Sequence, residues 1–193
     1  MTCVVGYIDK KNHRTYLAAD SCVTDFWTAW KLKRGDKIIT RTGCVKGGAI
    51  MFGIAGEDRI SNVLRHDLVL PDHTSRKMTA EKYINGPFLA ALRKACKDAG
   101  FSKIHHNEET IDSHMLIAYH NKLYVIYEGF AVDEMDSPYH AIGCGYSFAF
   151  GALAAMEGTS LTPKVRAKKA VLAACRYDPF VDEPVVLREL TWS

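Results

Sequence analysis

The sequence predicts an α+β fold of four layers, in which two stacked antiparallel sheets lie between two layers of helices. Apolar and polar residues alternate in several short runs, which is typical of strands with one buried face. Runs with helical spacing follow the strands, and the second half of the chain repeats this order. Because every sheet and helix must bury an apolar face, we expect helices on the outer face of each sheet.

Polar turns and glycines separate the strands expected in the first half. A hairpin is predicted from residues 2–8 and 15–19, and a second pair of strands from residues 37–41 and 49–55. A helix is expected to begin near Glu57, because acidic residues in a first turn suit the helix dipole.

A longer helix is predicted over residues 79–99, with Thr79 as its N-cap and an interruption at Pro87. Another hairpin, a short strand, an Ala-rich helix, a helix that Pro163 opens and a last strand follow. We expect these elements at residues 114–119, 123–127, 139–142, 146–157, 163–177 and 184–190.

Length, composition and charge favour one globular domain over residues 1–193. Of the 193 residues, 48% are hydrophobic and 24% are charged, with a formal net charge of +3. A chain of this length buries a sizeable core without disulfides or metals. The weak charge, with no basic stripe, argues against nucleic acid as a partner. No apolar stretch approaches the ~20 residues that span a membrane, so we expect no membrane partner.

Cysteine spacing and the start of the chain bear on metals and on the compartment. The six cysteines include no C-x-x-C pair, which argues against a zinc ribbon, a thioredoxin-like motif and a dense disulfide framework. His105 and His106 precede Glu108 without the i, i+4 spacing of a helical metal site, so we expect a solvated loop. The first residues lack the pattern of a secretory signal. We expect a cytoplasmic protein with no metal and no cofactor.

Thr2 is the first candidate for chemistry. If Met1 is removed, Thr2 has a free α-amino group at the start of a strand, and its hydroxyl can act as a nucleophile with this amine as the base. The ordinary pKa of such an amine, about 7.7–8.0, suits proton transfer near neutral pH. Many proteins begin Met-Thr without a catalytic role, so position alone favours the ordinary interpretation.

Three further residues add weight to Thr2. Asp20 follows the second predicted strand and Lys37 opens the third, so the two could form a buried pair, although either alone is usually a solvated strand end. Gly56 ends an apolar strand just before a helix, where free N–H groups can bind an oxyanion. Together these residues describe a nucleophile, a cation with its counter-ion and an oxyanion site.

Taken in order, these pieces resemble the proteasome β-subunits and HslV-type threonine peptidases of the N-terminal nucleophile hydrolases. The resemblance covers nearly the whole chain, and its most specific match is Ala141-Ile-Gly-Cys-Gly-Tyr-Ser-Phe-Ala-Phe-Gly151. The other matching pieces are Thr2, Ala18-Ala19-Asp20-Ser21, Lys37-Ile38, Gly53-Ile54-Ala55-Gly56 and Arg176-Tyr177-Asp178.

The resemblance implies an αββα sandwich, a homo-oligomeric ring and an acyl-enzyme at threonine. Peptides or unfolded proteins are the implied substrates, and an ATP-dependent unfoldase is a possible partner. The implied roles are Thr2 as nucleophile and base, Lys37 as electrostatic support, Asp20 and Asp178 as orienting carboxylates, and the Gly56 N–H as oxyanion donor.

The chain departs from the pattern of this family at several serines. Cys144 and Tyr146 stand where the family has two of them, and Val181 replaces another after Asp178. The resemblance implies that these serines orient the α-amine and a water, so we expect slower chemistry or an altered relay with Cys144 as a weak donor. Cys144 and Tyr146 therefore remain candidate catalytic residues.

The same resemblance locates a substrate pocket beside Glu57 and Asp58, where Asp58 is expected to favour basic side chains. The other residues expected to bind substrate are Ser21 and the apolar Val23, Ile39 and Ile54. Two alternatives remain open: a ring subunit that has lost catalysis, and an N-terminal nucleophile that acts on a non-peptide amide.

Overall fold

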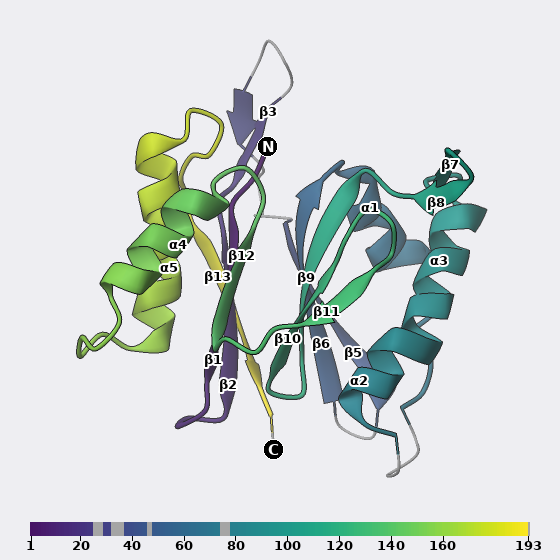
Figure 1. Cartoon of the computed structure of the whole chain (residues 1–193), viewed down its shortest axis with the longest axis horizontal. Coiled ribbons are helices and arrows are strands. Elements are labelled where there is room, and N and C mark those ends of the chain that lie inside the picture. The colour runs from purple at the N-terminus through teal and green to yellow at the C-terminus, as the bar shows by residue number, and fades with distance from the viewer. Residues whose placement is uncertain (25–28, 32–36, 46–47, 74–77, 193) are drawn as a thin grey trace.

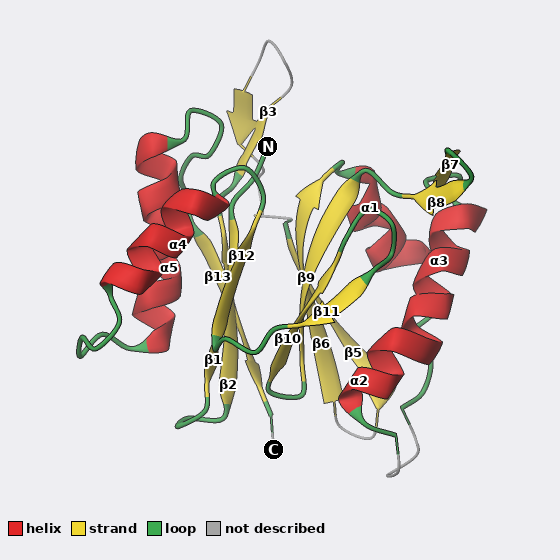
Figure 2. Cartoon of the chain, viewed as in Figure 1, coloured by secondary structure: helices red, strands yellow, loops and turns green. Residues whose placement is uncertain are grey.

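In the part of the chain that the computed structural model describes, two antiparallel sheets lie face to face between two groups of helices (Figure 1, Figure 2). The described residues are 1–24, 29–31, 37–45, 48–73 and 78–192. One helical layer covers the outer face of each sheet, on the left and on the right of Figure 1. This αββα sandwich confirms the predicted fold class.

The first sheet contains the strands nearest both ends of the chain. In spatial order its strands are β12 (Tyr139–Ile142), β1 (Val4–Asp9), β2 (Arg14–Ala19) and β13 (Val186–Thr191). Val4 of the inner strand β1 pairs with Ala19 on one side and with Ile142 on the other. Asp20 and Gly143, which follow β2 and β12, therefore lie beside the residues that precede β1.

The second sheet forms the other inner layer. In spatial order its strands are β11 (Val132–Glu134), β10 (Lys122–Ile126), β9 (Ser113–Tyr119), β6 (Gly48–Gly56) and β5 (Ile38–Val45). Small hairpins pair β3 (Cys22–Thr24) with β4 (Ala29–Lys31) and β7 (Lys103–His105) with β8 (Glu108–Thr110). The sequence does not predict these hairpins or β11, because strands of this length show no alternation that separates them from loops.

The helices form the two outer layers. On the second sheet lie α1 (Arg59–Asn62), η1 (Val63–Asp67), α2 (Ala80–Tyr83), η2 (Ile84–Phe88) and α3 (Leu89–Asp98). On the first sheet lie α4 (Tyr146–Ala155) and α5 (Pro163–Tyr177). The helix predicted over residues 79–99 is present as α2, η2 and α3, with Thr79 as its N-cap. Pro87 lies in the π-helical turn η2, because proline lacks the N–H of an α-helical hydrogen bond.

Apolar clusters fill the spaces between these layers. Val4, Leu17 and Leu116 are fully buried between the two sheets. Other clusters join α4 and α5 to the first sheet, and α1 to α3 to the second. No helix of the described residues is long and apolar enough to cross a membrane.

Candidate active site

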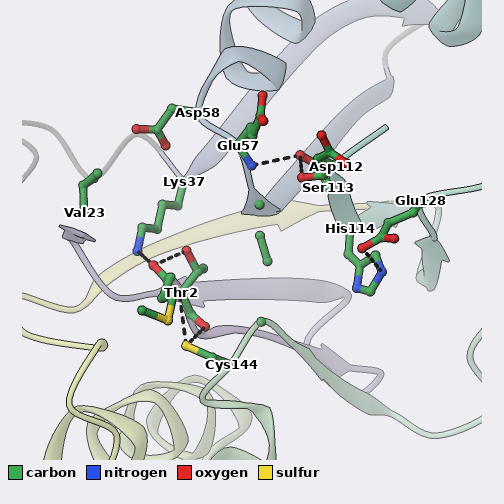
Figure 3. A pocket seen from close by; sticks show the side chains of 14 residues that line it. Thr2, Val23, Lys37, Glu57, Asp58, Asp112, Ser113, His114, Glu128 and Cys144 are labelled. Atoms are coloured by element: carbon green, nitrogen blue, oxygen red, sulfur yellow. Dashed lines mark hydrogen bonds and ion pairs between the residues drawn. The ribbon is translucent and has the colours of Figure 1, made fainter. Parts of the chain in front are cut away.

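Thr2 lines a pocket where the residues before β1 meet the end of β6 and the start of β9 (Figure 3). The pocket has a volume of about 520 Å³, and Thr2 itself is buried. The predicted site residues that line it are Thr2, Val23, Lys37, Gly56, Asp58 and Cys144. The fold therefore brings together residues that are up to 142 positions apart in the sequence.

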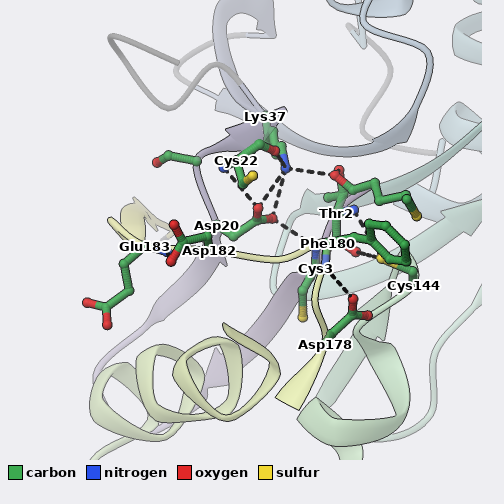
Figure 4. Close-up of polar contacts among 12 residues, drawn as sticks. Thr2, Cys3, Asp20, Cys22, Lys37, Cys144, Asp178, Phe180, Asp182 and Glu183 are labelled. Carbon is green, nitrogen blue, oxygen red and sulfur yellow. Dashed lines mark hydrogen bonds and ion pairs between the residues drawn. The ribbon is translucent and has the colours of Figure 1, made fainter. Parts of the chain in front are cut away.

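A buried ion pair lies beside Thr2 (Figure 4). The Lys37 ammonium donates to both carboxylate oxygens of Asp20, each 2.9 Å away, and to the Cys22 carbonyl oxygen at 2.5 Å. Asp20 also accepts the N–H groups of Cys3 at 2.9 Å and of Cys22 at 3.0 Å. Because hydrogen bonds satisfy both ions, the pair is stable in this buried position and the lysine charge is fixed there.

The Met1 carbonyl oxygen connects this pair to the Thr2 hydroxyl. It accepts a hydrogen bond from Thr2 Oγ1 at 2.6 Å and another from Lys37 Nζ at 3.1 Å. While Met1 is attached, the Thr2 nitrogen is a peptide nitrogen, whose lone pair is delocalised and cannot accept a proton. Removal of Met1 would convert this nitrogen into an amine and release the acceptor that Thr2 and Lys37 share.

The segment from Gly143 to Gly145 holds the backbone of Thr2. The Thr2 carbonyl oxygen accepts hydrogen bonds from the Gly145 N–H at 3.3 Å and from the Cys144 thiol at 3.4 Å. The Thr2 N–H in turn donates to the Cys144 sulfur at 3.4 Å. Gly143 has a φ of +90°, and a Cβ there would lie 2.2 Å from the Thr2 carbonyl oxygen. Glycine is therefore required at this close approach.

Asp178 lies beside the Cys144 thiol, at the C-terminal end of α5 (Figure 4). It is buried, and its carboxylate accepts the Phe180 N–H at 2.9 Å. Loss of water around the sulfur raises the pKa of Cys144; the Thr2 backbone hydrogen bond opposes this, and Asp178 raises the pKa further. The thiol is therefore protonated at neutral pH and can donate a hydrogen bond.

Gly56 closes the opposite side of the pocket. Its φ is +139°, and a Cβ there would lie 2.4 Å from the Asp112 carbonyl oxygen. The next residue, Glu57, donates its N–H to this carbonyl oxygen and to Ser113 Oγ, both at 3.1 Å. The backbone at the end of β6 is therefore fixed against the start of β9, with Gly56 at the pocket.

Three residues that the sequence did not predict at the site, Asp112, His114 and Glu128, also line the pocket. His114 Nε2 lies 3.7 Å from Glu128 Oε1, and Asp112 forms an ion pair with Lys103 at 2.6 Å. The hydrogen bond that the Lys103 ammonium donates to the Asp112 carboxylate raises the pKa of Lys103. Asp112 and His114 reach the pocket through the pairing of β9 with β6, and Glu128 through the pairing of β10 with β9, which no local sequence pattern encodes. Asp58, Asp112 and Glu128 form a rim of carboxylates.

Three residues expected to bind substrate do not line this pocket, which corrects their predicted place. Ser21 is buried, and its hydroxyl donates to the Pro184 carbonyl oxygen at 2.6 Å. Ile39 and Ile54 share one face of the second sheet with Phe52 and pack against the helices. Successive side chains of a strand point to opposite faces of the sheet, so Ile39 and Ile54 point to the face that the helices cover.

Tyr146 does not line the pocket either, which corrects its predicted catalytic place. It is the first residue of α4, and its ring is exposed. The ring packs edge-to-face against Phe150, with 6.2 Å between their centroids. The first turn of α4 therefore directs Tyr146 into a different pocket, while Cys144 turns toward Thr2.

This arrangement has the parts of a nucleophilic site. A hydroxyl and a buried ammonium group meet in one pocket, which Gly56 also lines, and such groups can generate and stabilise a tetrahedral oxyanion. The carboxylate rim suits a cationic side chain on the substrate. The described residues contain no group of three or more His, Cys, Asp or Glu side chains that could bind a metal ion.

Comparisons with known proteins find similar solved structures. A scan against protein-family models finds no match for the chain, and a search of curated proteins finds none. Thiobacillus denitrificans BPH in complex with epoxomicin is similar with a TM-score of 0.79 and 22% sequence identity, over 100% of each chain. A second structure of BPH from the same organism is similar with a TM-score of 0.78 and 21% identity, over 100% of this chain and 99% of that one.

More distant structures have the same arrangement of layers. Eukaryotic HslV from Trypanosoma brucei is similar with a TM-score of 0.68 and 18% identity, over 99% of this chain and 100% of that one. The Anbu (Gly-1) mutant from Hyphomicrobium sp. strain MC1 has a TM-score of 0.67 and 16% identity, over 97% of this chain and 80% of that one. At these identities the shared feature is the fold.

Proposed function

We propose that this chain, which has the fold of the proteasome-type N-terminal nucleophile hydrolases, is a threonine hydrolase that cleaves peptide bonds after Met1 is removed. One observation carries the proposal. The Thr2 hydroxyl and the Lys37 ammonium donate to the same carbonyl oxygen, and Lys37 forms a buried ion pair with the Asp20 carboxylate.

In the proposed reaction Thr2 Oγ1 attacks the substrate carbonyl carbon, and a C–O bond forms while the hydroxyl proton passes to the free α-amine of Thr2. The N–H at Gly56 stabilises the negative charge that develops on the carbonyl oxygen. The C–N bond then breaks, and the α-ammonium gives its proton to the leaving amine. Water attacks the remaining ester with the α-amine again as base, which releases the acid and restores the hydroxyl.

The surrounding residues have supporting roles in this proposal. The Lys37 charge lowers the free energy of negative charge on Thr2 Oγ1, and Asp20 fixes that charge in position. The Cys144 thiol contacts both the nitrogen and the carbonyl oxygen of Thr2, so it would orient the new amine with Asp178 behind it. This chain then uses a thiol where the resemblance implies a serine.

The proposal extends to substrate and assembly. Asp58 and the other rim carboxylates support a preference for peptides or unfolded proteins with a basic side chain next to the scissile bond. The resemblance also supports a homo-oligomeric ring, an ATP-dependent unfoldase as partner and a cytoplasmic location. The free cysteines of the described chain suit a reducing compartment and are Cys3, Cys22, Cys96, Cys144 and Cys175.

The residues Cys144 and Tyr146, which stand where the resemblance implies serines, favour a second candidate, a ring subunit without catalysis. With Met1 attached, the base that the hydrolase needs does not exist. The two functions therefore differ in whether Met1 is removed.

Turnover by Thr2 variants tests the proposal. The full chain, with loss of Met1 verified by mass, is incubated with internally quenched peptides that carry one arginine. Thr2→Ala should lower kcat/KM by at least about 100-fold. Thr2→Ser is the matched control, since it keeps a hydroxyl and should keep measurable turnover. Equal unfolding curves would show that both variants are folded, and peptide cleavage by Thr2→Ala at the wild-type rate would refute the mechanism.

A further inference from the structure

A second pocket of about 390 Å³ lies next to the first, between β12, β10 and the start of α4. Its walls include Val125, Tyr127, Ile142, Tyr146 and Phe150. The described residues that line it include no lysine, arginine or carboxylate. The function proposed above uses none of these side chains.

The two pockets adjoin each other at His114 and Gly143, which line both. Gly143 touches the Thr2 carbonyl oxygen, where a Cβ would lie only 2.2 Å away. No side chain can therefore separate the nucleophile from the second pocket at this point. In Figure 3, Val23 and Asp58 lie at one end of the first pocket and His114 lies at the other. A ligand that extends from Asp58 past Thr2 thus arrives at the second pocket.

The chemistry of the second pocket is opposite to that of the first. Glu57, Asp58 and Asp112 line the first pocket, whereas aliphatic and aromatic side chains line the second. Burial lowers the pKa of His140, so this histidine is neutral at pH 7 and adds no charge to the second pocket. His114, which faces both pockets, lies next to the Glu128 carboxylate. Burial of an apolar group in this pocket is favourable, whereas a charged group would lose its hydration and find no partner.

We propose that the second pocket binds an apolar or aromatic side chain of the same peptide whose scissile bond lies at Thr2. We assign the acyl side of the peptide to the end of the first pocket that Gly56 and Asp58 line, so this side chain belongs to the leaving-amine side of the bond. An extended chain advances about 3.3–3.6 Å per residue, so the first or second residue after the scissile bond reaches the pocket. The inference rests on the proposed function and narrows its substrate class to peptides that are basic before the bond and apolar after it.

A peptide series tests this inference. Internally quenched peptides keep one arginine before the bond and carry Leu, Phe, Gly or Asp at the first or second position after it. The full chain without Met1 should cleave the Leu and Phe peptides with a kcat/KM about 10-fold above that for Gly, and the Asp peptide more slowly than Gly. Equal rates for Leu, Gly and Asp at both positions would overturn the inference.

Substitution of Tyr146 connects that preference to the pocket. Tyr146→Ala should lower the Leu-to-Gly ratio by at least about 3-fold, and Tyr146→Phe should keep it. Phe148→Ala is the matched control, because Phe148 is 41% exposed on the same helix, against 50% for Tyr146, but does not line the pocket. An equal effect of Phe148→Ala and Tyr146→Ala would overturn the inference. So would loss of the oligomer in Tyr146→Ala with an unchanged ratio, since a second subunit would then cover the pocket.

The outcome separates this inference from the proposed function. If Thr2 forms a covalent adduct with an epoxyketone and peptides are cleaved, but the ratio is close to one, the second pocket is not a substrate site while the hydrolase remains. If no adduct forms at Thr2 and no peptide is cleaved, the proposed function fails and the inference fails with it.

Discussion

The two walls of the Thr2 pocket are built in different ways. On the nucleophile side, the ion pair of Asp20 and Lys37 has side chains only 0% and 5% exposed, and backbone groups satisfy both ions. On the opposite wall, the side chains of Lys103 and Asp112 are 65% and 52% exposed. The buried pair of Asp20 and Lys37 is stable in one hydrogen-bonded geometry, whereas water can replace either partner of the exposed pair of Lys103 and Asp112.

This difference separates chemistry from selectivity. Removal of one partner of a buried ion pair leaves an uncompensated charge, which is costly. The two side chains are therefore held in one hydrogen-bonded arrangement. An exposed pair contributes little to stability and can change without loss of the fold. We therefore expect the buried wall to determine whether the site reacts and the exposed wall to determine what it binds.

Unfolding stability should show the largest contrast between the walls. Asp20→Ala leaves Lys37 as an unpaired buried charge and should lower the free energy of unfolding by about 3–5 kcal/mol. Asp112→Ala, the matched exposed carboxylate, should have a much smaller effect because water solvates Lys103. Urea unfolding at neutral pH measures both. Similar losses for the two variants would remove the distinction between the walls.

The activity of a neutral buried pair sharpens the comparison. Asp20→Asn combined with Lys37→Met leaves no unpaired charge and should recover stability lost in either single variant. It should still lower kcat/KM by at least about 100-fold, since no cation then faces the Thr2 hydroxyl. Lys103→Met is the control on the other wall. A folded double variant with wild-type turnover would exclude an electrostatic role for Lys37.

Substrate preference should change with the exposed rim. Asp58→Asn should lower the ratio of kcat/KM for an arginine peptide to that for a glutamine peptide by about 5-fold or less, and salt should weaken this ratio in the wild type. Asp67→Asn, an exposed carboxylate outside the pocket, should not change it. If the ratio is the same in all three proteins, Asp58 does not contribute to selectivity.

The smallest expected effect concerns the thiol between the walls. The pKa of Cys144 is raised, so at any pH less of it is thiolate than of an unperturbed cysteine. Alkylation of Cys144 by iodoacetamide at pH 8 should therefore be slower than that of a short cysteine peptide and should still increase above pH 9. Peptide mapping identifies which cysteine is alkylated, and Cys144→Ser is the control in which this site cannot react. Faster alkylation than in the peptide would show a stabilised thiolate instead.

The sequence predicted the buried wall better than the exposed one, for a physical reason. Thr2 and Asp20 belong to one local hairpin, in which Val4 pairs with Ala19, so a strand pattern already brings them together. Asp112 and His114 reach the pocket only through pairing of β9 with β6. Local periodicity does not determine which strands pair at that distance in sequence.

Side-chain direction explains the other differences between prediction and structure. Ile39 and Ile54 lie on strands near the pocket, but alternation directs them to the helical layer, and the sequence alone does not tell which face is which. Tyr146 follows Cys144 by two residues, yet the start of α4 turns its ring away from Thr2. A match of motif spacing therefore located the segment without determining each side chain.

The most direct test of the central claim is intact mass spectrometry on protein expressed without an N-terminal tag, before and after incubation with an epoxyketone. We predict the loss of one methionine and then a single adduct that maps to Thr2 and is absent in Thr2→Ala. A chain that retains Met1 and forms no adduct would contradict the hydrolase and leave the ring subunit without catalysis.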